Sequence, residues 1–142
     1  MKNRQFLGLV CALTMIFGLS ACNKDSLKSC VEHEKTACNE DLNKTNIRIV
    51  NASKYDFCNV SVNSGGTPSL YGIIESGINT CYHSFDLAYA IADISLVIGD
   101  KKFTITPESY IGEQPLGNGK FTYTIDVLNF NSGLLSLKTS KN

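Results

Sequence analysis

Short runs of alternating apolar and polar residues fill the chain from residue 46 to its end. The runs occupy residues 46–50, 57–63, 69–74, 80–85, 91–98, 102–106, 120–130 and 134–139. Alternation with a period of two places neighbouring side chains on opposite faces, as in a half-buried β-strand. Turn residues separate the runs, and Gly99-Asp100-Lys101 and Asn131-Ser132-Gly133 are expected hairpin connections. The pattern predicts an all-β fold, a single antiparallel β-sandwich of immunoglobulin-like or transthyretin-like type.

Two details of the pattern lead to further expectations. The segment 84–92 is rich in helix formers and predicts one or two helical turns. In the strand just before it, alternation places Cys81 and His83 on one face. The same rule places Cys58 on the face of its own strand that carries Val60 and Val62. We therefore expect both cysteines to point toward an apolar face.

The N-terminus carries a different pattern, in which two cations precede a short apolar stretch and small residues. Lys2 and Arg4 are followed by 14 uncharged residues, 6–19. As a helix this stretch would be about 21 Å long, shorter than a ~30 Å hydrocarbon core, which is typical of a cleaved signal peptide. Its end, Leu19-Ser20-Ala21-Cys22, resembles the lipobox of bacterial lipoproteins at all four positions. The resemblance implies that the thiol of Cys22 accepts a diacylglyceryl group with fatty acyl chains such as palmitate. A protease then cuts the chain before Cys22.

These features divide the chain into a signal peptide (1–21), a lipidated cysteine with a polar tether (22–45) and a β-sandwich domain (46–142). The tether is polar, charged and free of aromatic side chains, which is typical of a linker. Within it, Asp25-Ser26-Leu27 resembles the acceptor triplet of protein O-glycosylation in Bacteroidota, which implies Ser26 as the modified residue. No later segment is long and apolar enough to span a membrane, so the N-terminal lipid is the expected membrane contact.

Charge excludes one class of partner. Without the signal peptide, 11 basic residues face 13 acidic ones, a net charge of −2. Such a chain offers no basic surface for a polyanion, and we expect no nucleic-acid partner. The identity of a protein or glycan partner stays open.

Four cysteines remain in the mature chain behind the lipid anchor: Cys30, Cys38, Cys58 and Cys81. An even number in an exported protein predicts two disulfides. Three pairings are open, and we expect Cys30–Cys38 and Cys58–Cys81. The first requires a bent loop, because a helix would separate the two Cα atoms by about 12 Å, beyond the ~7 Å bridging limit.

Residues 30–38 could also bind a metal ion, since Cys30, His33 and Cys38 are all potential ligands. A structural zinc site normally has four protein ligands, and the usual Cys-x-x-Cys spacing is absent. We therefore predict no metal site and no cofactor.

Catalytic motifs are missing as well. The chain has no Gly-x-Ser-x-Gly elbow, and its two histidines are His33 and His83. His83, Ser84 and Asp86 are neighbours in sequence, but strand alternation sends His83 and Ser84 to opposite faces. The sequence predicts that the protein is not an enzyme.

Candidate binding residues lie in the long Gly- and Pro-containing loop 107–119, which carries Glu108, Tyr110 and Glu113. Sugar-binding sandwiches often use flat aromatic platforms, and this chain has no tryptophan. The aromatic side chains that could serve instead are Tyr71, Tyr82, Tyr89, Tyr110 and Tyr123.

A family resemblance extends over about residues 46–126. The stretch "IRIVNAS…NVSVNSG…YGIIESG…CYHSF" resembles a β-sandwich domain of unknown function found in secreted and lipid-anchored bacterial proteins. The continuation resembles small lipoproteins of Flavobacteriia and relatives, through a Pro-x-x-Tyr-x-Gly-Glu stretch at Pro107, Tyr110, Gly112 and Glu113. No function is known for that family, so the resemblance assigns no activity. The lipobox-like segment, the polar tether and a sandwich without catalytic motifs predict a lipid-anchored cell-envelope protein, in the outer membrane, that acts as a binding or accessory module. Alternatives are a carbohydrate-binding module or an exported hydrolase.

Overall fold

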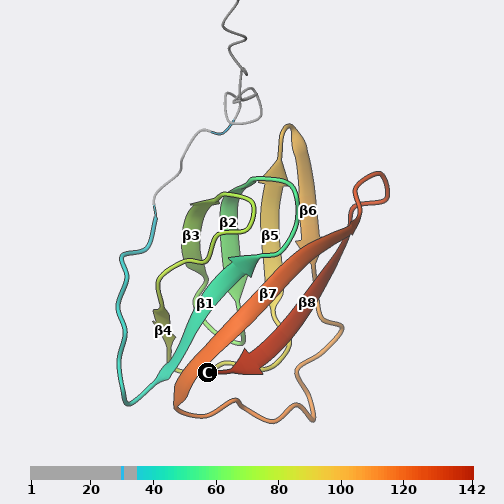
Figure 1. Ribbon diagram of the computed structural model, residues 1–142. Helices are drawn as coiled ribbons and strands as arrows, with labels where there is room; N and C mark the ends of the chain where they lie inside the picture. The colour runs from blue at the N-terminus through green and yellow to red at the C-terminus, as the bar shows by residue number, and fades with distance from the viewer. Residues whose placement is uncertain (1–29, 31–34) are drawn as a thin grey trace, which may run out of the picture.

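The computed structural model describes residue 30 and residues 35–142, and this part of the chain contains strands and no helix (Figure 1). The strands are β1 (Thr45–Asn51), β2 (Phe57–Asn63), β3 (Ser69–Ile74), β4 (His83–Phe85), β5 (Asp93–Ile98), β6 (Lys101–Ile105), β7 (Gly119–Asn129) and β8 (Leu134–Lys141). Each strand overlaps one of the runs of alternating residues. The predicted all-β fold is confirmed.

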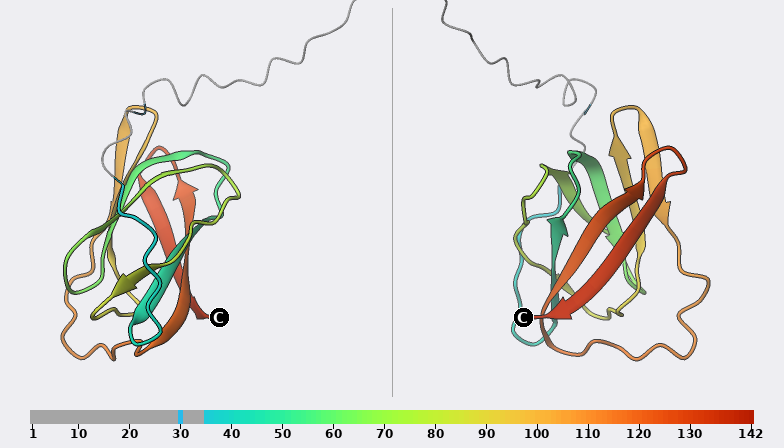
Figure 2. Two further views of the ribbon diagram at one scale, coloured as in Figure 1. Left: turned by 90° about the vertical axis from the view of Figure 1, so that its left-hand side faces the viewer. Right: turned by 45° about the vertical axis from the view of Figure 1, so that its right-hand side comes forward.

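The strands form two four-stranded sheets that pack face to face as a sandwich (Figure 2). One sheet has the order β4-β1-β7-β8 and the other β3-β2-β5-β6. One pairing differs from the expected antiparallel arrangement, because β1 runs parallel to β7 from Thr45↔Gly119 to Asn51↔Ile125. A parallel pair needs a long crossover. Here the crossover contains the whole second sheet.

The core lies between the sheets and follows the period-two pattern. Ile47 and Ile49 of β1 and Ile125 of β7 are buried on one side, and Val60 of β2 and Leu96 of β5 on the other. Burying each such side chain contributes roughly 1.5–3 kcal/mol of hydrophobic free energy. The two hairpin turns expected from sequence connect β5 to β6 and β7 to β8. Their glycines, Gly99 and Gly133, have positive φ angles, a conformation that glycine adopts at little cost.

Residues 35–40, the N-terminal strap, lie along one side of the sandwich (Figure 1). Thr36 pairs with the edge strand β3: its N–H donates to Leu70 O at 2.9 Å, and its Oγ1 accepts from Leu70 N at 3.0 Å. Asn39 pairs with the edge of the other sheet through a parallel bridge to His83, and its N–H donates to Tyr82 O at 3.3 Å. The segment expected to be a free tether thus has its C-terminal part hydrogen-bonded to both sheets.

The disulfides are Cys30–Cys58 and Cys38–Cys81. The expected presence of disulfides is confirmed, but the expected pairing was wrong. Cys58 was placed on the core face by strict alternation, whereas β2 contains a bulge at Asn59, which has a φ of +50°. The extra residue puts Phe57 on the core face with Val60 and leaves Cys58 outside the core cluster. Cys58 therefore bonds Cys30 of the N-terminal segment and not Cys81.

The helical turns predicted for 84–92 are also wrong. The backbone of this segment bonds to distant groups: Tyr89 N donates to Ser64 Oγ at 2.8 Å, and Leu116 N donates to Ala88 O at 2.9 Å. Ala88 and Ala92 are fully buried. Tertiary contacts satisfy the polar backbone here, and they override a local helical preference.

Candidate functional site

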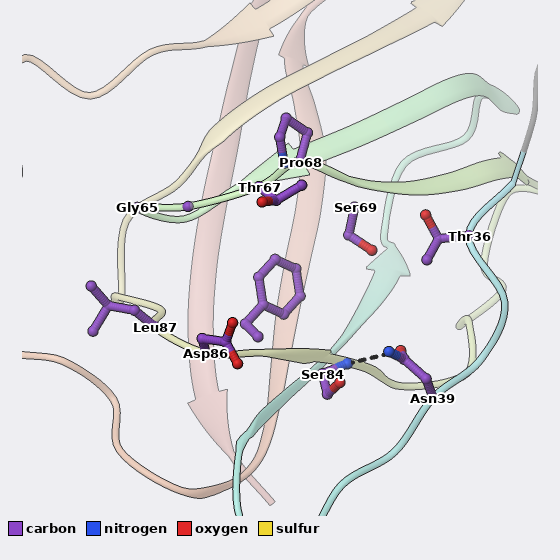
Figure 3. Close-up of a pocket in the computed structure, with 11 residues that line it drawn as sticks. Thr36, Asn39, Gly65, Thr67, Pro68, Ser69, Ser84, Asp86 and Leu87 are labelled. Carbon is purple, nitrogen blue, oxygen red and sulfur yellow. Dashed lines mark hydrogen bonds between the residues drawn. The ribbon is translucent and has the colours of Figure 1, made fainter.

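A pocket of about 320 Å³ lies where the β2–β3 turn, β4 and the N-terminal strap meet (Figure 3). The strap supplies Thr36 and Asn39. The remaining lining residues come from the turn with the start of β3 and from β4 with the residues after it: Gly65, Gly66, Thr67, Pro68, Ser69, Ser84, Phe85, Asp86 and Leu87. The lining mixes hydroxyl, amide and apolar groups. It contains no cationic side chain.

The polar groups at the pocket are held by the surrounding structure. Ser84 N donates to Asn39 Oδ1 at 3.1 Å, which fixes the strap amide against β4 (Figure 3). Asp86 forms an ion pair with Lys44 at 2.8 Å. The hydrogen bond and charge of Asp86 raise the pKa of Lys44 above its ordinary value. The single acid of the lining is therefore already paired on the protein surface.

The turn above the pocket depends on glycine. Gly65 has a φ of +90°, and a Cβ atom there would lie 2.7 Å from the Tyr89 ring. Gly66 N donates to Asn63 Oδ1 at 2.9 Å, which closes the turn. A Cβ added to Gly66 meets no atom within 4 Å. Gly66 therefore offers an open position at the pocket for a test side chain.

Ser69 connects the pocket lining to a buried histidine. Its Oγ lies 2.6 Å from Nδ1 of His83. The His83 side chain is 1% exposed and stacks on Tyr71, with ring centroids 4.0 Å apart. Among the described residues, Nε2 of His83 has no hydrogen-bond partner. Burial and the charge of Lys35 lower the pKa of His83, which favours the neutral ring.

The structure does not assemble His83, Ser84 and Asp86 into a catalytic group. His83 is buried, Ser84 faces the pocket side, and Asp86 pairs with Lys44. The serine in contact with His83 is Ser69, which sequence reasoning missed because it lies on a different strand. A Ser–His pair of a hydrolase also needs a group that orients the second ring nitrogen. No such group occurs in the described part of the chain.

The candidate loop 107–119 is partly structural. Tyr110 Oη accepts a hydrogen bond from Asp93 N and donates one to Asn63 O, both at 3.1 Å, and burial raises its pKa. Glu113 is exposed. Glu108 lies at a separate cleft of about 400 Å³, lined mainly by apolar residues of β6, β8 and residues 90–92. The three residues therefore do not converge on one site.

The other candidate tyrosines do not form a flat exposed platform. Tyr71 and Tyr123 are fully buried. Tyr89 contacts Tyr110 at a centroid distance of 5.1 Å. Tyr82 is half-buried beneath the cations of Arg48 and Lys120. Of these side chains, the Tyr82 ring is the one packed against cationic groups.

Several sequence predictions fall on residues outside the described ranges. These are the signal peptide 1–21, the lipidation site Cys22, the O-glycosylation candidate Ser26 and the histidine of the rejected metal cluster, His33. Its two cysteines, Cys30 and Cys38, belong to different disulfides. Within the described ranges, no helix is long and apolar enough to cross a membrane.

The fold thus defines a disulfide-bonded β-sandwich, and disulfides are typical of proteins outside the cytoplasm. No family model and no curated protein match the chain. Among solved structures, the chain is similar to a protein from Eubacterium rectale whose structure was determined by NMR. The TM-score is 0.46 at 17% sequence identity, over 70% of this chain and 88% of that one.

Proposed function

We propose that the protein is a lipid-anchored binding module of the bacterial cell envelope, not an enzyme. The lipobox-like Leu19-Ser20-Ala21-Cys22 supports the anchor, and the two disulfides support a location outside the cytoplasm. The resemblance of residues 46–126 to small lipoproteins of Flavobacteriia supports the outer membrane as the location. In this proposal, lipid on Cys22 attaches the protein to the membrane, and the sandwich is free to bind a second molecule.

The observation that carries the binding function is the pocket of about 320 Å³ on the strapped side of the sandwich. Small ligands bind in concave sites where a few fixed polar groups accompany apolar surface. Thr36, Asn39, Thr67 and Ser84 supply hydroxyl and amide groups, and Pro68 supplies apolar surface. The hydrogen bond between Asn39 and Ser84 holds part of this lining in place before any ligand arrives.

The lining favours a neutral, hydroxyl-rich ligand, and a carbohydrate is the class that fits it best. The lining residues include no cation that could pair with a phosphate or carboxylate ligand. Hydroxyl and amide side chains can both donate to and accept from sugar hydroxyls. Asp86 adds one acceptor at the rim.

A glycan array with the mature protein tests this function. Gly66→Tyr places a large side chain at the pocket, where the added Cβ has open space. Thr104→Tyr, at an exposed position on β6 at the far edge of its sheet, is the matched control. We expect glycan binding that Gly66→Tyr abolishes and Thr104→Tyr preserves. Binding that survives Gly66→Tyr would remove the pocket as the site, and an array without any signal would count against a sugar ligand.

The membrane face is tested separately. Protease treatment of intact cells, followed by immunoblotting for the domain, reports whether the sandwich is exposed at the cell surface. We expect the protease to digest the sandwich domain in intact cells, as it would on the external face of the outer membrane. Survival in intact cells with digestion after the outer membrane is opened would assign the domain to the periplasmic face.

A further inference from the structure

Three groups with affinity for soft metals lie together beside the pocket. The sulfurs of Cys38 and Cys81 and a ring nitrogen of His83 are all within 4.8 Å of one another. Cys38 belongs to the strap, Cys81 precedes β4, and His83 opens β4. The two sulfurs are joined as a disulfide. In this state they are not thiolates and bind no metal.

His83 has one ring nitrogen held by a partner and one without a hydrogen-bond partner among the described residues, as in many metal-binding histidines. Ligating histidines usually donate their second ring N–H to a fixed partner, which leaves the other nitrogen for the metal. Ser69 Oγ lies 2.6 Å from Nδ1 and can accept that hydrogen bond. Nε2 has no hydrogen-bond partner among the described residues, although the side chain is 1% exposed. An unsatisfied buried polar atom is unusual in a native protein and needs an explanation.

We propose that Cys38, Cys81 and His83 form a binding site for Cu(I) when the Cys38–Cys81 disulfide is reduced. A dithiol reductant supplies two electrons and two protons: the S–S bond breaks, two thiols form, and the dithiol becomes a disulfide. Binding of Cu(I) then releases the thiol protons and forms two Cu–S bonds and one Cu–Nε2 bond. The site is distinct from the cluster of Cys30, His33 and Cys38 that the sequence suggested.

The ligand set selects the metal. Soft thiolates favour Cu(I) or Zn(II), and imidazole is compatible with both. Structural zinc sites are normally completed by four protein ligands, and this cluster offers three. Cu(I) accepts a lower coordination number, so two sulfurs and one nitrogen are sufficient for it.

The fold keeps the three ligands close after the disulfide opens. Thr36 and Asn39 lie on either side of Cys38 and bond to β3 and to the chain around β4. Cys81 and His83 are two residues apart, and the stack on Tyr71 holds the His83 ring. Cys38 is exposed, so a thiolate of the reductant can reach its sulfur.

The test uses the full-length mature lipoprotein in detergent, reduced with a dithiol, desalted without oxygen and titrated with Cu(I) against a coloured Cu(I) chelator. Cys30→Ser/Cys58→Ser removes the other dithiol and leaves the proposed site intact. In this variant we expect one Cu(I) per chain after reduction and none before it. X-ray absorption is expected to show two sulfur ligands and one nitrogen ligand.

Three further variants, each made in the Cys30→Ser/Cys58→Ser background, separate the proposed site from adventitious thiol binding. Cys38→Ser/Cys81→Ser should abolish the binding. His83→Gln should remove the nitrogen ligand and weaken binding by more than about 100-fold. This exceeds the about 10–100-fold effect expected for a residue that contacts a ligand but not the metal. Ser69→Ala should weaken binding by about 10–100-fold, with unchanged far-ultraviolet circular dichroism. Equal affinity in the Cys30→Ser/Cys58→Ser protein with and without His83→Gln or Ser69→Ala would overturn the proposal.

The site can also be tested without the Cys30→Ser/Cys58→Ser variant. If Cys30→Ser/Cys58→Ser does not fold, the titration is made in the otherwise unchanged protein, where the second pair of thiols adds a separate equivalent. His83→Gln should then lower the affinity for one of the two Cu(I) equivalents and leave the affinity for the other unchanged. Two equivalents that are both indifferent to His83→Gln would again overturn the site.

Discussion

Tyr71 and His83 stack with their ring centroids 4.0 Å apart and their planes within 8° of parallel, although the two residues belong to different sheets. Tyr71 also donates a hydrogen bond from its hydroxyl to Ile47 O in β1, at 2.9 Å. Burial raises the pKa of Tyr71, so its hydroxyl stays protonated and can donate this bond. The pair therefore connects the two sheets directly behind the strap and the pocket.

The first prediction concerns pH in the oxidised protein. Burial beside Tyr71 and the charge of Lys35 lower the pKa of His83 from 6.5 in the folded state. Below about pH 6.5 the unfolded state binds more protons than the folded state, so the free energy of unfolding falls as the pH drops. Above that pH the contribution of His83 is complete. We expect a lower thermal midpoint at about pH 5 than at about pH 7.

A histidine variant identifies the group responsible. His83→Gln should reduce the difference between the two midpoints. Circular dichroism melts at both pH values make the comparison. An identical pH dependence in wild type and His83→Gln would show that another group is responsible.

The second prediction concerns disulfide connectivity and stability. Cleavage with trypsin and a Glu-specific protease separates all four cysteines, because Lys35 lies between Cys30 and Cys38 and Glu75 lies between Cys58 and Cys81. Mass spectrometry without reductant should find Cys30 joined to Cys58 and Cys38 joined to Cys81. Sequence separations of 28 and 43 correspond to loop-closure contributions of about 3.5 and about 4 kcal/mol. A Cys58–Cys81 peptide would contradict the bulged register of β2.

The third prediction compares two adjacent glycines. Gly65→Ala should lower the free energy of unfolding by about 1–2 kcal/mol, because φ is +90° and the new Cβ would lie 2.7 Å from the Tyr89 ring. Gly66→Ala should change it by less than about 0.5 kcal/mol, since its Cβ enters open space. Urea unfolding curves measure both variants. Equal effects at the two positions would argue against the described turn.

The fourth prediction concerns the proposed anchor. Cys22→Ser should abolish incorporation of a labelled fatty acid and leave unprocessed precursor, because the serine hydroxyl does not replace the thiol that accepts the lipid. Cys11→Ser, within the apolar stretch of the predicted signal peptide, should leave labelling intact. Label retained in Cys22→Ser would refute the lipoprotein assignment.

Local alternation predicted the strands well because the two faces of a half-buried strand differ in polarity. Val60 and Val62 point to the core as expected, and so do Ile94 and Leu96. The rule failed at Cys58, where Asn59 adopts a positive φ angle and inserts an extra residue. Asparagine tolerates this conformation better than most residues. Nothing in the residue pattern marked Asn59 as the position, and the disulfide pairing was wrong as a result.

The pocket could not be predicted, because its two sides come from segments with different apparent roles. Thr36 and Asn39 lie in a polar segment that composition alone marks as a linker, yet their polar groups satisfy the edges of β3 and β4. Ser69 and Ser84 stand near turns and strand ends, where small polar residues are common. These residues come together only when the two sheets and the strap pack against one another. A single sequence does not show that they are close.

The Cys30–Cys58 disulfide also connects the N-terminal segment covalently to a strand, which matters if the domain is pulled. In a protein anchored at Cys22, the chain between the anchor and Cys30 can extend to about 27 Å at most. Tension applied through the lipid would enter the sandwich at Cys58 in β2, an inner strand paired with β3 and β5. The disulfide would thus give this tension a covalent path into the sheet that does not pass through the hydrogen bonds of the strap.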